Sequence, residues 1–432
     1  MKGMIYMIIY VVKPGDSIYS IAKANGTSQD KIIRENEITD PTHLVVGQTL
    51  VITENPKTHT VLSGESVYTI AKKYGVSSEA LIKANHSLVN PNSIFVGEKL
   101  IIPAEQKKLG TINVNGYVLT TTNMEVLRKT LPHLTFLSIF SYDVMANGSL
   151  TTINDDAIIT AARNANVAPI MVITNIIEGS GFSSTLAHTI LTNQQAQDAL
   201  IANVLRIMKA KNYYGLNIDF EYIFPYDKES YNNFVRKVTE IMHRQGYIVT
   251  TALAPKNSAT QRGLLYEAHD YPVHGATVDF VILMTYEWGY VAGPPLPVAP
   301  LDRVKKVLDY AVAAIPSKKI LMGIPNYGYD WKLPYEPGTR ATTISNVEAV
   351  NRAFVNKARI EYNTVAQSPF YNYYESGGRG HIVWFEDARS IQAKLMLVNE
   401  YKLGGVSYWT LGRYFPQNWL VLESMYNVRK VL

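Results

Sequence analysis

The sequence contains no cysteine, which excludes disulfide bonds and thiolate metal sites. It also lacks any run of Lys or Arg that would mark a nucleic-acid-binding patch. The formal net charge of +5 is small for 432 residues, although it could favour anionic polymers. The composition, with 47% hydrophobic and 18% charged residues, is typical of a globular protein with a large core. The length predicts two or three domains.

The first residues, Met1 to Val12, form a short apolar segment with a single lysine. They resemble a signal peptide, but no small-residue cleavage site follows, because the segment runs directly into Lys13-Pro14-Gly15-Asp16. The segment is also too short to span a bilayer. We therefore expect a strand of the first domain and no ordinary secretory signal, so an extracytoplasmic destination would need another route.

An internal repeat fills the first hundred or so residues. Each copy predicts a strand, a Gly-Asp/Glu-Ser turn that also caps a helix, two short helices, and a final strand after a second glycine. The corresponding segments are Val12 to Lys23 with Val61 to Lys72, Asn36 with Asn85 and, after one inserted residue, Val46 to Leu50 with Val96 to Leu100.

Both copies resemble lysin motif (LysM) domains in their turn, their Ile-Ala pair, the Asn that ends the second helix and the Val-Gly-x-x-Leu before the last strand. The resemblance implies βααβ modules at 1–53 and 57–103 that bind glycans containing N-acetylglucosamine, such as peptidoglycan or chitin. Two structural domains without a ligand are the alternative. Two weak modules in one chain would raise the avidity for a repeating polymer. The expected groove walls are Gly15 to Tyr19 with Leu44 to Gly47, and Gly64 to Tyr68 with Ile94 to Gly97.

From Leu109 onward, apolar strand-like segments alternate with helix-like ones such as Gln194 to Lys211 and Lys228 to Gln245. Eight βα units over roughly three hundred residues predict a (β/α)8 barrel at 109–432, with catalytic groups at the C-terminal ends of the strands. The interval at about 331–398 is too long for one crossover and predicts a small α+β insertion beside the cleft. The expected strands are Thr111 to Val118, Thr135 to Tyr142, Ala168 to Thr174, Gly215 to Tyr222, Ile248 to Ala254, Asp279 to Glu287, Ile320 to Tyr327 and Gly405 to Leu411.

The fourth of these strands alternates polar and apolar residues. Asn217, Asp219 and Glu221 would share one face, with the apolar residues on the other. Alone, this pattern would indicate an antiparallel strand with one face in water. A barrel strand has no such face, and three unpaired polar groups pointing inward would cost roughly several kcal/mol, so we expect them to be functional.

At this strand the chain resembles glycoside hydrolase family 18, the chitinase and N-acetylglucosaminidase family, whose fourth strand ends in Asp-Gly-x-Asp-x-Asp-x-Glu. Here Tyr214 and Asn217 stand at the first two Asp positions, and Asp219 and Glu221 are retained. With the LysM copies, the architecture resembles that of the cortex-lytic N-acetylglucosaminidases of spore-forming bacteria. Three further matches are Met284-Thr285-Tyr286-Glu287 to the sixth-strand Met-x-Tyr-Asp, Gly323-Ile324-Pro325-Asn326-Tyr327-Gly328 to the seventh-strand Gly-x-Pro-x-Tyr-Gly, and Trp409 to the eighth-strand tryptophan.

The resemblance implies a retaining, substrate-assisted reaction, in which the sugar's own 2-acetamido oxygen attacks the anomeric carbon and forms an oxazolinium intermediate. Glu221 would be the general acid and then the base. Asp219 would orient the acetamido group and stabilise the intermediate, and Tyr286 would hydrogen-bond the acetamido oxygen. Trp409 would stack beneath the sugar. The other substrate-binding candidates are Asn217, Tyr222, Met284, Glu287 and Tyr327. Of these, we expect Tyr222 and Met284 to pack in the cavity wall rather than make a specific contact with the sugar.

Two departures from the family pattern change what we expect of the acids. Asn217 removes a carboxylate beside Asp219; its amide could hydrogen-bond Asp219 but could not share a proton. We therefore expect Asp219 to stay ionised over a wider pH range. Glu287 is one methylene longer than the family's Asp, which leaves its acetamido contact open.

The predicted function is a β-N-acetylglucosaminidase of peptidoglycan, acting on spore cortex or cortex fragments and needing no cofactor or metal. The mechanism requires a free acetamido group, which admits N-acetylglucosamine and excludes muramic lactam. We expect a spore-associated protein of the cortex or coat, made in the mother-cell cytoplasm, without nucleic-acid binding or membrane insertion. The alternatives are a noncatalytic glycan-binding protein, a structural coat protein, and a hydrolase of chitin or glycoprotein glycans.

Overall fold

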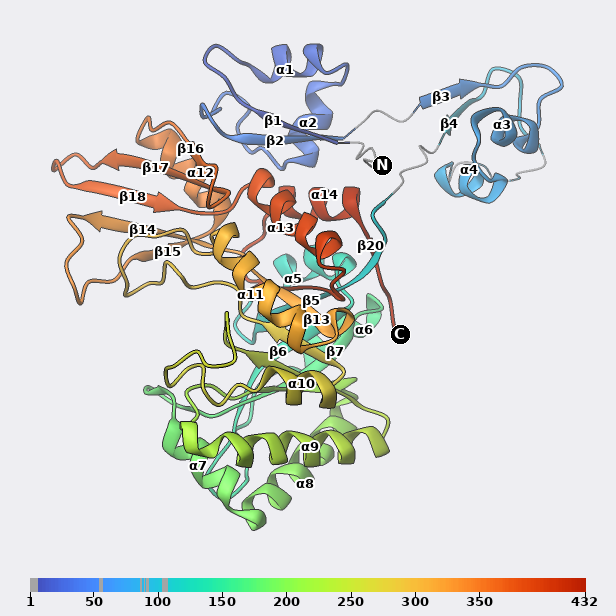
Figure 1. Ribbon diagram of the computed structural model, residues 1–432. Helices are drawn as coiled ribbons and strands as arrows, with labels where there is room; N and C mark the ends of the chain where they lie inside the picture. The colour runs from blue at the N-terminus through green and yellow to red at the C-terminus, as the bar shows by residue number, and fades with distance from the viewer. Residues whose placement is uncertain (1–6, 54–56, 86–87, 89, 91–92, 103–107) are drawn as a thin grey trace.

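The computed structural model describes residues 7–53, 57–85, 88, 90, 93–102 and 108–432. The first six residues of the predicted N-terminal strand, and most of both predicted links between domains, lie outside this part. Figure 1 shows the two repeat copies in blue as separate units, which precede a large α/β body in the chain.

Both repeat copies have the predicted βααβ order. Ser17 and Ser66 cap the first helix of each copy, and each exchanges hydrogen bonds with the residue three positions later. In each copy one antiparallel strand pair closes the unit. The elements are β1 (Met7–Val11), α1 (Ile18–Ala24), α2 (Gln29–Glu35) and β2 (Thr49–Thr53), then β3 (Lys57–Thr60), α3 (Val67–Tyr74), α4 (Ser78–Ala84) and β4 (Lys99–Ile102).

The body is the predicted (β/α)8 barrel. Eight parallel strands pair in chain order, and pairing of the last strand with the first closes the barrel. A short strand, β20 (Asn427–Val428), adds to the outer edge of the first. The barrel strands are β5 (Thr111–Leu119), β6 (Phe136–Asp143), β7 (Ala168–Thr174), β10 (Gly215–Asp219), β11 (Ile248–Leu253), β12 (Phe280–Leu283), β13 (Ile320–Pro325) and β19 (Gly405–Trp409).

Five of the barrel strands end earlier than predicted, and two of them end three or four residues early. The fourth, β10, ends at Asp219, and the sixth, β12, ends at Leu283. Tyr222 and Glu287 have positive φ angles of 54° and 67°, a left-handed conformation that cannot continue a strand. Glu221 therefore lies beyond the end of the strand rather than on one strand face with Asn217 and Asp219.

Helices surround the barrel, and a separate five-stranded sheet follows β13. The predicted insertion begins slightly earlier than expected, at Gly328, and its sheet ends at Trp384. Short β8 (Ile176–Ile177) and β9 (Gly181–Phe182) form a hairpin after β7. The helices are α5 (Met124–Thr130), α6 (Asp156–Asn164), α7 (Ser184–Thr192), α8 (Gln194–Lys211), α9 (Lys228–Arg244), α10 (Tyr271–Thr277), α11 (Leu301–Ala314), α13 (Ala388–Glu400), α14 (Pro416–Met425) and the 3-10 turns η1 (Leu131–His133), η2 (Pro225–Asp227) and η3 (Ser317–Lys319); the insertion contains β14 (Gly328–Leu333), β15 (Thr342–Ile344), α12 (Asn346–Val355), β16 (Glu361–Asn363), β17 (Ser368–Tyr374) and β18 (Gly380–Trp384).

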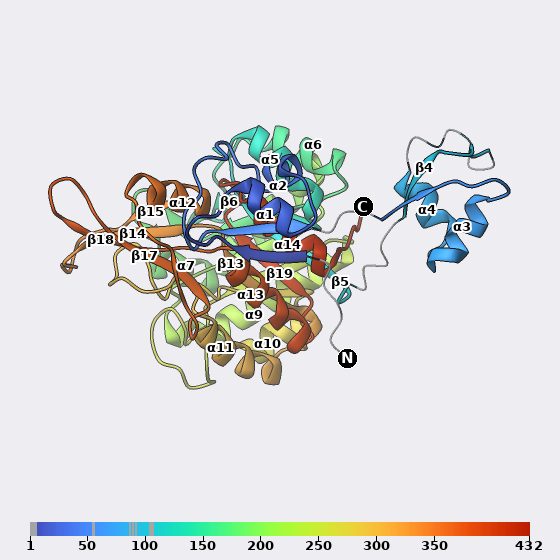
Figure 2. The same ribbon diagram turned by 90° about the horizontal axis from the view of Figure 1, so that it is seen from above.

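One apolar core lies between the strands and their helices, and the insertion has a small core of its own. Of the helices in the described ranges, none combines the length and the apolar character that crossing a membrane requires. Figure 1 and Figure 2 both show the first repeat copy lying on the barrel and insertion, and the second copy standing apart from them.

Candidate active site

A cavity of about 480 Å³ opens beyond the C-terminal ends of the barrel strands, where a barrel of this type places its reacting groups. Seven of the nine predicted site residues line it. Asn217 and Tyr327 do not line it, and they hydrogen-bond to residues that do. The predicted residues on the cavity wall are Asp219, Glu221, Tyr222, Met284, Tyr286, Glu287 and Trp409.

Asp219 and Glu221 are two carboxylic acids in the cavity wall, the first buried and the second half-buried. Asp219 is only 4% exposed, and its Oδ1 has no hydrogen-bond partner among the described residues. Burial raises the pKa of Asp219 to about 7. Burial also raises the pKa of Glu221 well above its ordinary value, and the nearby charges of Asp219 and Glu287 raise it further. Glu221 is therefore suited to carry a proton at neutral pH.

The main chain around Glu221 is fixed by a residue that the sequence did not reveal. The side chain of buried Asn175, which follows β7, accepts a hydrogen bond from the Glu221 N–H at 2.9 Å and donates one to its carbonyl oxygen at 2.9 Å. His269 makes a second bridge, because its ring nitrogens lie 3.0 Å from the Phe220 carbonyl oxygen and 2.8 Å from the Ala254 N–H. These contacts set where the Glu221 carboxyl group points, although the chain there is no longer a strand.

Asn217 lies beneath the cavity and is fully buried. Its Oδ1 accepts a hydrogen bond from the Tyr117 hydroxyl at 3.1 Å, and its Nδ2 donates to Thr250 at 2.8 Å. Both ends of the amide are thus engaged away from Asp219, so the expected hydrogen bond between Asn217 and Asp219 is not formed. Burial raises the pKa of Asp219, and the expectation that Asn217, in place of an acid, keeps Asp219 ionised over a wider pH range stays a prediction.

Tyr286 and Glu287 follow the sixth strand into the cavity. Tyr286 is 9% exposed, and burial and the neighbouring acids raise the pKa of its hydroxyl, which therefore stays a hydrogen-bond donor. Glu287 accepts hydrogen bonds from the hydroxyls of Tyr327 and Tyr329, the latter at 3.0 Å. Burial raises the pKa of Glu287, and these two hydrogen bonds oppose the rise. The longer side chain of Glu287 is thus held by two tyrosines, Tyr327 just after the seventh strand and Tyr329 in the insertion.

Aromatic rings form much of the remaining wall. Trp409 at the end of β19 packs edge-on against Tyr117 and Phe140, with ring centroids 5.3 and 5.0 Å away. This support orients the indole, which lines the cavity as predicted for a sugar-stacking ring. Tyr222 is 40% exposed, so packing alone does not account for it. The aromatic lining residues that the sequence did not single out are Tyr117, Phe140, Phe182, Tyr266, Trp288 and Tyr290.

The arrangement can carry out acid–base chemistry on a ring-shaped polar ligand. It offers a protonated acid, a hydroxyl donor and aromatic faces. It also offers a buried carboxyl group, whose ionised form a positive charge on the ligand would stabilise. Within the described residues, no group of three or more His, Asp or Glu side chains is placed to hold a metal ion.

Comparisons with known proteins agree with this geometry. The family model of glycosyl hydrolases family 18 matches residues 114–413, and the LysM domain model matches 10–53 and 59–103. The chain is 43% identical to the cortical fragment-lytic enzyme of Bacillus subtilis (strain 168), over 98% of this chain and 99% of that protein. The crystal structure of the Bacillus megaterium QM B1551 spore cortex-lytic enzyme SleL superposes with a TM-score of 0.85 at 40% identity, covering 99% and 100% of the two chains. A chitinase from Chromobacterium violaceum gives a TM-score of 0.68 at 26% identity over 73% of this chain and 98% of its own.

Proposed function

Because the chain belongs to the family 18 glycosyl hydrolases and carries two LysM domains, we propose that it is a β-N-acetylglucosaminidase of peptidoglycan that degrades spore cortex fragments. Its similarity to a cortical fragment-lytic enzyme over nearly the whole of both chains supports the choice of substrate. The observation that carries the proposal is the pair of acids, Asp219 buried and Glu221 half-buried, in the wall of an aromatic cavity.

We propose that Glu221 first acts as the general acid. Its raised pKa keeps it protonated at neutral pH, so it can protonate the glycosidic oxygen as the bond to the anomeric carbon breaks. The 2-acetamido oxygen of the same sugar attacks that carbon and closes the oxazolinium ring. Glu221, now a carboxylate, then accepts a proton from the water that opens the ring. Two inversions at one carbon retain the β configuration.

Asp219 would hold the acetamido group during this step. Its Oδ1 is free to accept the acetamido N–H, and its negative charge would stabilise the positive oxazolinium ring. The Tyr286 hydroxyl would donate to the acetamido oxygen, and Trp409 would lie beneath the pyranose ring. In this scheme Tyr222, Met284 and Glu287 contact the sugar. Tyr327 holds Glu287, and Asn217 holds Tyr117 of the cavity wall.

The chemistry limits which bonds can be cut. The sugar whose anomeric carbon reacts must carry a free acetamido group, so N-acetylglucosamine qualifies and muramic lactam, whose amide is closed in a ring, does not. Cleavage would therefore leave N-acetylglucosamine at the new reducing end. The LysM domains would hold the enzyme on the polymer, which fits a spore-associated protein of the cortex or coat.

The test is product analysis with a matched variant. Wild type, Glu221→Gln and the exposed control Glu361→Gln are incubated with cortex fragments and with chitin oligosaccharides, and new reducing ends are identified by mass spectrometry. We expect N-acetylglucosamine ends on cortex fragments from wild type and Glu361→Gln, and a loss of roughly a hundredfold or more in Glu221→Gln. Equal inactivity of all three would favour a noncatalytic glycan-binding or coat role. Faster cleavage of chitin would favour the chitinase alternative suggested by the Chromobacterium relative.

A further inference from the structure

The two LysM copies have similar sequences but unequal surroundings. In the first copy, the segment from Val45 to Thr49 is largely buried, and in the second, the corresponding segment from Phe95 to Lys99 is largely exposed. Val45 is 4% exposed and Phe95 71% exposed. This segment contains most of one of the two walls expected to form the glycan groove, so the difference concerns binding and not only packing.

The insertion covers this wall in the first copy. Val45 belongs to the same apolar cluster as Ile344 and Ile360 of the insertion. The Val46 carbonyl oxygen accepts a hydrogen bond from the Ile360 N–H at 3.0 Å. A Cβ added to Gly47 would lie 1.9 Å from the Ile360 carbonyl oxygen, whereas one added to Gly97 of the second copy would meet no atom within 4 Å.

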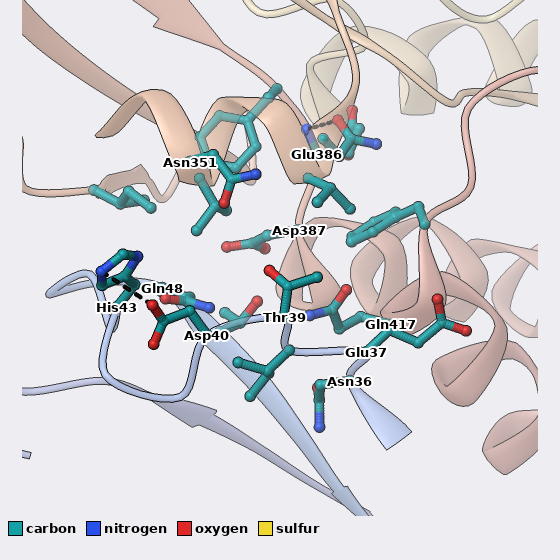
Figure 3. A pocket seen from close by; sticks show the side chains of 18 residues that line it. Asn36, Glu37, Thr39, Asp40, His43, Gln48, Asn351, Glu386, Asp387 and Gln417 are labelled. Carbon is teal, nitrogen blue, oxygen red and sulfur yellow. Dashed lines mark hydrogen bonds and ion pairs between the residues drawn. The ribbon is translucent and has the colours of Figure 1, made fainter. Parts of the chain in front are cut away.

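Further contacts fix the first copy to the catalytic body. Met7 and Val51 belong to the main barrel core. Arg389 at the start of α13 donates to the Gly47 carbonyl oxygen at 3.3 Å, and Lys129 of α5 pairs with Glu37 at 3.1 Å. Figure 3 shows Asp40 and His43 of this copy facing Asn351 and Asp387 across a small cavity of about 130 Å³ between the two parts.

The second copy exposes four large apolar side chains at the expected walls, here called the apolar strip: Leu62 just before the first wall, Tyr68 within it, and Phe95 and Val96 in the second. These four side chains are 56%, 67%, 71% and 69% exposed. Such exposure of large apolar groups on a small module indicates a binding surface. Aromatic and aliphatic faces of this kind suit the apolar faces of pyranose rings.

Charge favours an anionic polymer for the second copy. Residues 57–102 contain five lysines and three glutamates, whereas residues 7–53 contain four basic and five acidic side chains. Peptidoglycan carries carboxylates on its peptides, and chitin does not, so a net positive module is matched to peptidoglycan.

We propose that the two copies have divided their roles, and this inference rests on the proposed function. The first copy is a fixed part of the catalytic body and no longer has an open groove. The second copy binds the peptidoglycan polymer through the strip of Leu62, Tyr68, Phe95 and Val96. The second copy thus binds the enzyme to peptidoglycan, while the first copy keeps the insertion in place beside the catalytic cleft.

The repeat supplies a matched test, because Tyr19 and Tyr68 occupy the same position and are 60% and 67% exposed. Full-length Tyr19→Ala, Tyr68→Ala and Phe95→Ser are prepared in a Glu221→Gln background, so that the polymer survives, and are pelleted with insoluble peptidoglycan and with chitin. We expect Tyr68→Ala and Phe95→Ser to lower the affinity for peptidoglycan about five- to tenfold and Tyr19→Ala to leave it unchanged. Thermal unfolding shows whether each exposed variant is folded.

Equal losses from Tyr19→Ala and Tyr68→Ala, no loss from either, or tighter pelleting with chitin than with peptidoglycan would each overturn the division of roles. These outcomes are separate from the proposed function, which fails if the wild-type enzyme releases no reducing ends from soluble cortex fragments, whatever the pelleting shows.

Discussion

Replacing Asp219 by Asn should make the protein more stable at neutral and alkaline pH while it impairs catalysis. The carboxyl group of Asp219 is 4% exposed, and burial raises its pKa from 3.8 to about 7. Between these two values the unfolded chain loses the proton and the folded chain keeps it. Stability therefore falls as the pH rises from about 4 to about 7 and then stays level.

The size of this effect follows from the shift. A rise of about three units, at about 1.4 kcal/mol per unit, means that the ionised Asp219 lowers the free energy of unfolding by at most about 4 kcal/mol above pH 7. An amide of the same shape does not titrate. Asp219→Asn should therefore gain stability over wild type as the pH rises, from near zero at pH 4 to about 2–4 kcal/mol at pH 8.

A second buried acid is the matched control. Asp330 is 3% exposed, but it pairs with Arg352 at 2.7 Å and His381 at 2.7 Å. Asp330→Asn should lower the free energy of unfolding by roughly 3 kcal/mol at neutral pH, because it leaves the buried His381 and the charge of the half-buried Arg352 without this partner. Urea unfolding of both variants and wild type at pH 4 and pH 8 measures the two effects. If Asp219→Asn is no more stable than wild type at pH 8, the site is not the desolvated cavity described above.

Asn175→Ala should lower kcat by roughly tenfold or more with a smaller change in KM, because it frees the main chain that orients the Glu221 carboxyl group. Steady-state kinetics measures this effect, and an unchanged kcat would contradict the positioning role of Asn175. Asn217→Asp places a carboxyl group beneath Asp219 and should raise the pKa of Asp219 further, moving the pH–rate profile upward. A profile identical to that of wild type would contradict the coupling.

The sequence was sufficient to predict the barrel and the repeat copies, because both depend on local patterns. The alternation of apolar strands with helices indicated all eight barrel strands, and Ser17 and Ser66 marked the helix starts. Strand ends were predicted less well. Tyr222 and Glu287 are compatible with a strand by residue type, and only tertiary contacts hold them in the left-handed conformation.

The supporting residues of the site could not be predicted, since each acts through a contact between distant segments. Asn175 reaches Glu221 from the neighbouring strand, and Tyr117 reaches Asn217 across the barrel. An asparagine after a buried strand is too common a feature to indicate this role. The two repeat copies could not be distinguished from the sequence either, because the surface that covers Val45 belongs to the insertion, more than two hundred residues later in the chain.

The central claim is that the sugar's acetamido group, and not a protein carboxylate or a directly attacking water, forms the first bond to the anomeric carbon. Proton NMR of the first product released from N-acetylglucosamine-containing cortex fragments tests it, if spectra are recorded before the anomers equilibrate. The account predicts the β anomer, and no cleavage of fragments whose reacting sugar has lost its acetyl group. Initial release of the α anomer, or undiminished cleavage of the deacetylated fragments, would contradict it.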